Sequence, residues 1–106
     1  FEPMEGYSRE PPPISPTDSP ASRHIVSVNE ELFPESVSAP YVMLGGTDAY
    51  NYQAVSSQVY RYSPCVMQKE DLERVHGINE RLSVDALSIM VRFFYSLVQR
   101  WSTPEM

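Results

Sequence analysis

The sequence predicts an α/β fold for this chain of 106 residues, with long helices accompanied by short strands. Two segments, 19–33 and 83–101, repeat apolar residues every three or four positions, as amphipathic helices do. Two shorter segments, 41–44 and 59–64, are apolar or alternating, as strands are. Two short strands make only a small part of a sheet, so we expect the fold to be incomplete.

The first sixteen residues predict a connector without regular structure. Pro11, Pro12 and Pro13 follow one another, and consecutive prolines are confined to polyproline-like or edge-strand geometry. We therefore place a boundary between a Pro-rich connector, 1–16, and the remainder of the chain, 17–106.

The first predicted helix begins after Ser19, a residue that can cap it, with Pro20 at the first helical position. Pro34 ends it. His24 lies away from the apolar stripe, so we expect an ordinary solvated side chain. The stripe consists of Ala21, Ile25, Val28 and Leu32.

The run 41–44 predicts a buried strand that leads into a tight loop. In that loop Gly45 and Gly46 leave backbone N–H groups uncovered, Thr47 adds a hydroxyl, and Asp48 is expected to cap a following turn. These groups suit the binding of a carboxylate or carbonyl oxygen, although a plain Gly-Gly turn explains the same residues. A phosphate loop is excluded, because no Lys follows the glycines at the required place.

The segment 59–64 predicts a strand with one aromatic face, formed by Tyr60 and Tyr62. We interpret both tyrosines as core or cleft wall. The charged, helix-permissive segment 68–75 that follows is interpreted as a solvated surface.

The second long helix is predicted to begin at Ser83, a capping residue, with Asp85 near the positive end of the helix dipole. Its broad apolar stripe extends over about 27 Å and is expected to face the core rather than a membrane or cofactor. The stripe consists of Leu87, Met90, Val91, Phe94, Leu97, Val98 and Trp101.

Composition excludes several classes of function. The formal net charge of −6 and the lack of a basic stripe argue against a nucleic-acid partner. The single cysteine, Cys65, excludes an internal disulfide framework and a Cys-rich zinc site, and we expect a small, partly buried side chain there. No apolar run approaches the roughly 20 residues that span a bilayer.

His76 is the one candidate metal ligand in a structured setting. Gly77 follows it, and its freedom to take positive φ suits a tight loop, while Glu80 is four residues away. Lone histidines are more often structural, and Glu80 is equally well explained as a surface charge near the next helix. This spacing alone therefore decides nothing.

The order of motifs is more specific. The chain reads Pro40-Tyr41-Val42-Met43-Leu44-Gly45-Gly46-Thr47-Asp48-Ala49-Tyr50-Asn51-Tyr52, then Val59-Tyr60-Arg61-Tyr62-Ser63-Pro64, then Arg74-Val75-His76-Gly77-Ile78-Asn79-Glu80-Arg81-Leu82. From about residue 10 to residue 101 this set resembles the C-terminal part of the zinc peptidase and amidohydrolase family of carboxypeptidase S, aminoacylase and succinyl-diaminopimelate desuccinylase. The carboxypeptidase S branch is the most similar. Tyr50-Asn51 departs from that branch, which has Arg-His there.

The resemblance implies the C-terminal portion of a catalytic domain in which helices pack on a mixed central sheet. It also implies a cocatalytic zinc hydrolase that cleaves a peptide or an N-acyl amino acid amide bond. Of the protein ligands to its two zinc ions, this chain would supply the last, His76. Glu80 would orient the ligand loop, and Gly45, Gly46, Thr47 and Asp48 would form the cleft wall. The other ligands and the general base would lie upstream, and none of them is matched here.

The resemblance also implies the partners of the chain. The chain begins with Phe1 and matches only a C-terminal third, so we expect a piece of a longer protein whose remaining catalytic domain packs against it. The connector 1–16 would leave a lid domain that supports a homodimer. A cytoplasmic location is favoured, with a secreted or vacuolar one left open. The alternative is a non-catalytic relative that binds a partner, which Tyr50-Asn51 keeps open.

Overall fold

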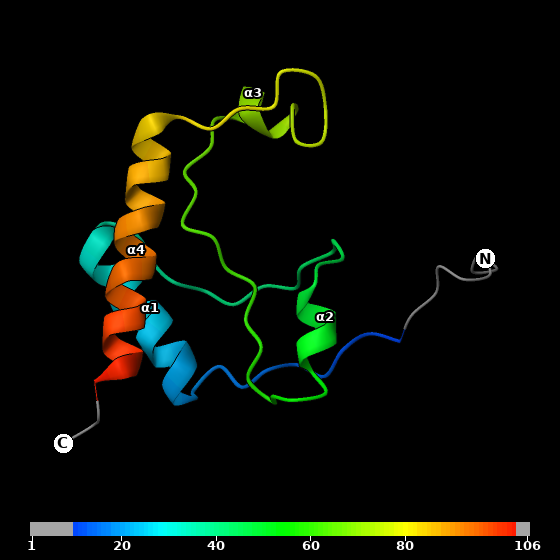
Figure 1. Cartoon of the computed structure of the whole chain (residues 1–106), viewed down its shortest axis with the longest axis vertical. Helices are drawn as coiled ribbons and strands as arrows, with labels where there is room; N and C mark the ends of the chain where they lie inside the picture. Colours follow the sequence, from blue (N-terminus) through cyan, green and yellow to red (C-terminus); the bar gives the residue numbers. More distant parts are fainter. Residues whose placement is uncertain (1–9, 104–106) are drawn as a thin grey trace.

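The computed structural model describes residues 10–103. Its helices are α1 (Pro20–Leu32), α2 (Ala49–Tyr52), α3 (Lys69–Leu72) and α4 (Val84–Ser102). Figure 1 shows α1 and α4 beside one another, with a long irregular path through α2 and α3 between them. The prediction of two long helices is confirmed. The sequence predicts no helix where α2 lies, and it predicts only a helix-permissive segment, 68–75, where α3 lies.

Local capping explains where the long helices begin. The side chain of Ser19 accepts a hydrogen bond from the backbone N–H of Ser22 at 3.1 Å, and Pro20 occupies the first turn of α1. The side chain of Ser83 accepts from the N–H of Ala86 at 3.0 Å, and α4 then runs for 19 residues. Both predicted caps are confirmed.

The core is small and lies between α1 and α4. Val28, Phe93 and Leu97 are its buried members, and Ile25 and Leu32 pack against them. The ring of Tyr62 adds to this cluster, with its centroid 5.1 Å from that of Phe93. Burial of each large apolar side chain contributes roughly 1.5 to 3 kcal/mol, so these few residues supply much of the stability of the helix pair.

The prediction that the apolar stripe of α4 faces the core is wrong for most of the residues in that stripe. Ala86, Phe93 and Leu97 are the buried residues of α4, and of these only Leu97 belongs to the predicted stripe. Phe93 and Leu97 pack against Val28 of α1. The helix is apolar over a wider arc than one neighbouring helix can cover, so the face turned to α1 is buried and the adjacent face is left open. Five stripe residues, between 43 and 61% exposed, form this outer face: Leu87, Val91, Phe94, Val98 and Trp101.

Neither predicted strand forms within residues 10–103. Segment 41–44 has neither helix nor strand and is open to solvent instead of buried, with Leu44 96% exposed. Segment 59–64 runs as an irregular trace to one side of α1 and α4 (Figure 1). A strand requires backbone partners on a neighbouring strand, and these two segments do not pair with each other.

The aromatic face predicted for 59–64 nevertheless exists. The hydroxyl groups of Tyr60 and Ser19 lie 2.6 Å apart, and the hydroxyl of Tyr62 donates to the side chain of Asn29. Both tyrosines thus contact α1 or its cap, in agreement with the interpretation of core or cleft wall.

The connector is described only in part, because residues 1–9 lie outside the described residues. Residues 10–16 have neither helix nor strand. Ser15 is tied to the far segment by two hydrogen bonds, accepting from the N–H of Val59 at 2.9 Å and donating to its carbonyl at 2.8 Å. Among the helices described, none combines the length and apolar character needed to cross a membrane.

Candidate metal-ligand loop

The loop that carries His76 directly follows α3 in the chain. At the start of that helix, the backbone N–H of Gln68 donates to the carboxylate of Asp71 at 3.3 Å, and Asp71 is the third helical residue. This is the geometry of a capping box, in which a side chain satisfies a free N–H group at the helix start. The chain continues in turns through residue 79 and then enters α4.

The backbone of this loop is unusual. His76 and Asn79 both have φ of 60°, the left-handed region that L-residues with a side chain rarely adopt. Such outliers persist only where the surroundings impose them, and they concentrate at functional sites. His76 is exposed, and no protein group in the described part of the chain hydrogen-bonds its ring. Its ring nitrogens are therefore open to an external partner.

Gly77 has a different role from the predicted one. The expectation that it supplies the positive φ is wrong, because the left-handed residues are His76 and Asn79. Its N–H donates to the carbonyl of Arg74 at 2.8 Å, and a Cβ at this position would lie 3.3 Å from that same oxygen. Glycine is favoured here because the chain passes close to its own backbone.

The Gly-Gly loop before α2 is exposed at all four predicted site residues. An added Cβ at Gly45 or Gly46 would meet no atom within 4 Å, so the backbone there is accessible. The expected cap by Asp48 is wrong, since its side chain makes no capping hydrogen bond. Thr47 substitutes for it, accepting from the N–H of Ala49 at 3.3 Å.

The structure does not join the predicted site residues. In Figure 1 the loop before α2 and the loop after α3 both lie away from the pair of long helices. Glu80 is exposed, and within 10–103 no hydrogen bond links it to His76. The described residues contain no group of three His, Cys, Asp or Glu side chains placed to hold a metal. The role of each predicted site residue stays a prediction.

Asp71 is the side chain that sequence reasoning missed. The sequence predicts a solvated surface residue here, yet the side chain of Asp71 is only 28% exposed and forms ion pairs with Arg74 at 3.1 Å and Arg81 at 3.9 Å. The first pair is readable from the sequence, because residues three apart on a helix are neighbours. The second joins residues on opposite sides of the loop and becomes visible only in the structure.

Comparison with known proteins assigns the chain to a family. The model of peptidase family M20/M25/M40 matches residues 3–100. The chain is 37% identical over 97 residues to N-fatty-acyl-amino acid synthase/hydrolase PM20D1 of Xenopus tropicalis, which covers 91% of this chain and 19% of that protein. To the human protein of the same name it is 33% identical over 99 residues, covering 91% and 20%.

A third relative comes from the carboxypeptidase side. Probable carboxypeptidase S-like 2 of Dictyostelium discoideum is 36% identical over 90 residues, which covers 85% of this chain and 17% of that protein. No solved structure matches the chain. The chain spans about a fifth of the length of the curated relatives it matches. The resemblance found in its motifs is confirmed, and the chain belongs to peptidase family M20/M25/M40.

Proposed function

We propose that the parent protein is a cocatalytic zinc-dependent hydrolase that cleaves a peptide or an N-acyl amino acid amide bond, and that this chain supplies the C-terminal part of its catalytic domain. The family match over residues 3–100 carries the proposal. The relatives are named as an N-fatty-acyl-amino acid synthase/hydrolase and as a probable carboxypeptidase S-like protein, and hydrolysis by either kind of enzyme would cleave an amide bond next to an amino acid.

His76 fits the role of one zinc ligand. Its ring is exposed and unpaired within the described residues, and neutral imidazole is a ligand that zinc favours. When bound, zinc supplies Lewis acidity and activates water for attack on a carbonyl. Because one imidazole cannot hold a catalytic ion, the remaining ligands and the general base come from other parts of the parent chain.

The loop of Gly45, Gly46, Thr47 and Asp48 is proposed as a wall of the substrate cleft. Its glycine backbone is uncovered, so N–H groups are available to a substrate carboxylate or carbonyl. Arg61 reaches the carbonyl of Gly45 at 3.5 Å and so connects this loop to segment 59–64. Glu80 is proposed to orient the loop of His76 within the assembled site.

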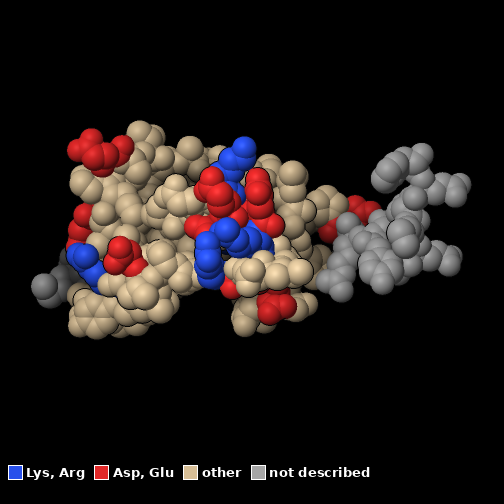
Figure 2. All heavy atoms as spheres, turned by 90° about the horizontal axis from the view of Figure 1, so that it is seen from above, with Lys and Arg blue, Asp and Glu red and all other residues tan. Residues whose placement is uncertain are grey.

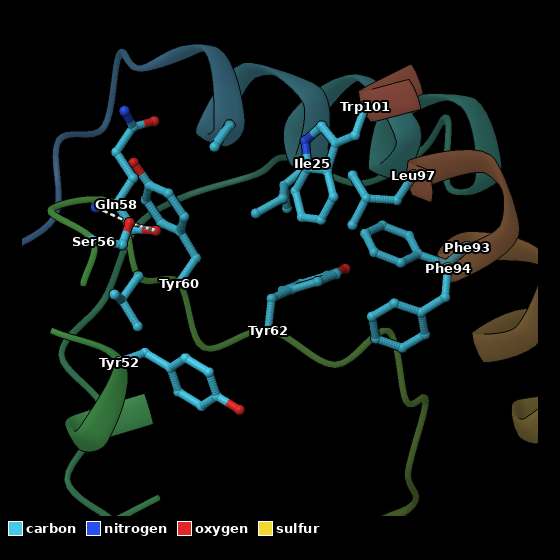
Figure 3. Close-up of a pocket in the computed structure, with 12 residues that line it drawn as sticks. Ile25, Tyr52, Ser56, Gln58, Tyr60, Tyr62, Phe93, Phe94, Leu97 and Trp101 are labelled. Carbon is cyan, nitrogen blue, oxygen red and sulfur yellow. Dashed lines mark hydrogen bonds between the residues drawn. The ribbon is translucent and has the colours of Figure 1, made fainter. Parts of the chain in front are cut away.

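We propose that the rest of the catalytic domain packs against the apolar surface that this chain leaves exposed. A hollow of about 350 Å³ lies between α1, α4 and the segment 56–62. Figure 3 shows the rings of Tyr62, Phe94 and Trp101 among the side chains that line it. The hollow opens beside the outer face of α4, and exposed apolar patches of this kind mark interaction surfaces. We propose that a mixed sheet covers it, with segments 41–44 and 59–64 as two of its strands.

We also propose where the domain boundary lies. The connector 1–16 is proposed to arrive from a lid domain, which would also provide a homodimer contact, and 17–106 to complete the catalytic domain. The ties between Ser15 and Val59 support this boundary, because they anchor the end of the connector to the segment proposed as a strand.

The decisive experiment changes His76 in the full-length parent protein. His76→Ala is expected to abolish hydrolysis of N-acyl amino acids and to lower zinc content. Changing a residue that only hydrogen-bonds to a metal ligand already lowers metal affinity or activity about 10- to 100-fold, so the loss of a ligand itself should lower them further. The fold is expected to survive, because an exposed loop residue leaves no cavity. His24→Ala, on α1, is the matched control and should change neither measurement.

Three outcomes decide between the proposals. Normal activity and zinc content in His76→Ala would remove this residue from the site. If His76→Ala unfolds, His76 has a structural role in the fold. If the unchanged parent protein neither binds zinc nor hydrolyses any N-acyl amino acid or peptide, the alternative of a non-catalytic binding relative gains, and the Tyr50-Asn51 departure already points in that direction.

A further inference from the structure

One carboxylate sits where the two ends of the His76 loop meet. Arg74 precedes the loop and Arg81 follows it, and both approach the same oxygen, Oδ1 of Asp71, at 3.1 and 3.9 Å. Figure 2 shows blue and red side chains gathered together on the face seen from above, the end of the molecule that carries α3 in Figure 1. Asp71 therefore connects α3 to the entry and the exit of the loop.

Asp71 is itself held in place. Its second oxygen, Oδ2, accepts a hydrogen bond from the backbone N–H of Gln68 at 3.3 Å, and its side chain is only 28% exposed. The carboxylate is thus anchored before it meets either arginine. An ion pair contributes more when one partner is already ordered, because less side-chain freedom is lost on pairing.

The loop needs such a restraint. Its two left-handed residues, His76 and Asn79, are disfavoured conformations, and Ile78 between them projects into solvent rather than into a core. Packing therefore does not impose this backbone. The restraints that the described residues offer are two backbone hydrogen bonds, from Val75 to the carbonyl of Leu72 and from Gly77 to that of Arg74, and the two ion pairs of Asp71.

We propose that Asp71 is a positioning residue for His76: by pairing with Arg74 and Arg81 it closes the loop at its base and holds the imidazole in the orientation needed for zinc. The inference rests on the proposed role of His76 as a zinc ligand. Asp71 itself touches neither metal nor substrate and acts through the loop.

The test uses Asp71→Asn in the full-length parent protein. Asparagine keeps the size of the side chain and an oxygen for the N–H of Gln68 but removes the charge that attracts the arginines. Zinc affinity, measured with zinc alone against a competing chelator, should fall roughly three- to tenfold, as expected for the loss of two partly exposed ion pairs. The value of kcat should fall by a similar factor, with KM within about twofold.

A second measurement needs neither zinc nor substrate. In the metal-free protein, tryptic cleavage after Arg74 and Arg81 should be faster in Asp71→Asn, because the loop opens more often. Glu70→Gln is the matched control: Glu70 adjoins Asp71 on α3, is exposed, and has no ion pair within residues 10–103. Asp71→Glu keeps the charge and should recover most of the lost zinc affinity.

The outcomes separate the two proposals. If Asp71→Asn matches Glu70→Gln in zinc affinity, the positioning role is wrong, even if cleavage becomes faster. If His76→Ala loses zinc while Asp71→Asn does not, the ligand stands and only the positioning role fails. If His76→Ala keeps its zinc, both fail. If Asp71→Asn does not fold, Arg81→Gln replaces it as the test, because this change removes one of the two ion pairs at an exposed side chain. Zinc affinity and kcat must then fall as well, by smaller factors than those expected for Asp71→Asn.

Discussion

Phe93 shows how much of the helix contact depends on a single side chain. It is 1% exposed, and its ring lies between those of Tyr62 and Phe94, at centroid distances of 5.1 and 5.4 Å. We expect Phe93→Ala to lower the free energy of unfolding of the parent protein by about 3 to 5 kcal/mol, through lost burial and the cavity left behind. Ser88→Ala, on an exposed position of the same helix, should change it little. Denaturant unfolding would measure both, and equal midpoints would contradict the core assignment.

Tyr62 is expected to make the free energy of unfolding depend on pH in the alkaline range. Burial raises the pKa of its hydroxyl above the ordinary value of 10.0, so the folded state holds the proton to higher pH than the unfolded state does. This contribution is complete below about pH 10 and is lost as pH rises through the folded pKa. Unfolding of the parent protein at about pH 9 and about pH 11 should show a smaller loss in Tyr62→Phe than in the original. An equal loss would show that this tyrosine ionises alike in both states.

At the scale of the element, α4 presents two apolar faces that differ in their surroundings. We expect Val91→Lys, on the outer face, to destabilise the parent protein by more than 1 kcal/mol, because a charge would be buried under the proposed sheet. In the isolated chain the same change should raise solubility, since it interrupts an exposed apolar patch. Ser88→Lys is the control in both. If Val91→Lys leaves the parent as stable as Ser88→Lys does, the outer face is not covered there.

For the whole molecule, the balance between core and surface predicts its behaviour in isolation. The buried core is small and lies at one contact between two helices, while many large apolar residues remain exposed. We expect the isolated chain of 106 residues to aggregate on expression. A monodisperse monomer with a cooperative thermal transition would favour an autonomous domain instead.

The isolated chain should also lack catalysis. One imidazole does not replace the ligand set that holds a catalytic zinc ion, so we expect weak zinc binding and no hydrolysis of N-acyl amino acids. Activity that a chelator abolishes, measured on the purified chain, would overturn this expectation. Addition of zinc without any rise in turnover would agree with it.

The sequence by itself determined the features that depend on near neighbours along the chain. Both long helices and both serine caps were predictable, because helix hydrogen bonds and caps join residues within one turn of each other. The order of the Gly-Gly-Thr-Asp and His-Gly motifs was enough to identify the family, and it singled out His76.

Only the tertiary structure decided what depends on partners distant in sequence. It placed Phe93 rather than Phe94 in the core, because α1 covers one face of α4 and not the other. It left 41–44 and 59–64 unpaired, since a strand takes its hydrogen bonds from another strand. It brought Arg81 to Asp71 across the loop. No local pattern encodes these contacts, because each is made by segments that meet only when the chain is folded.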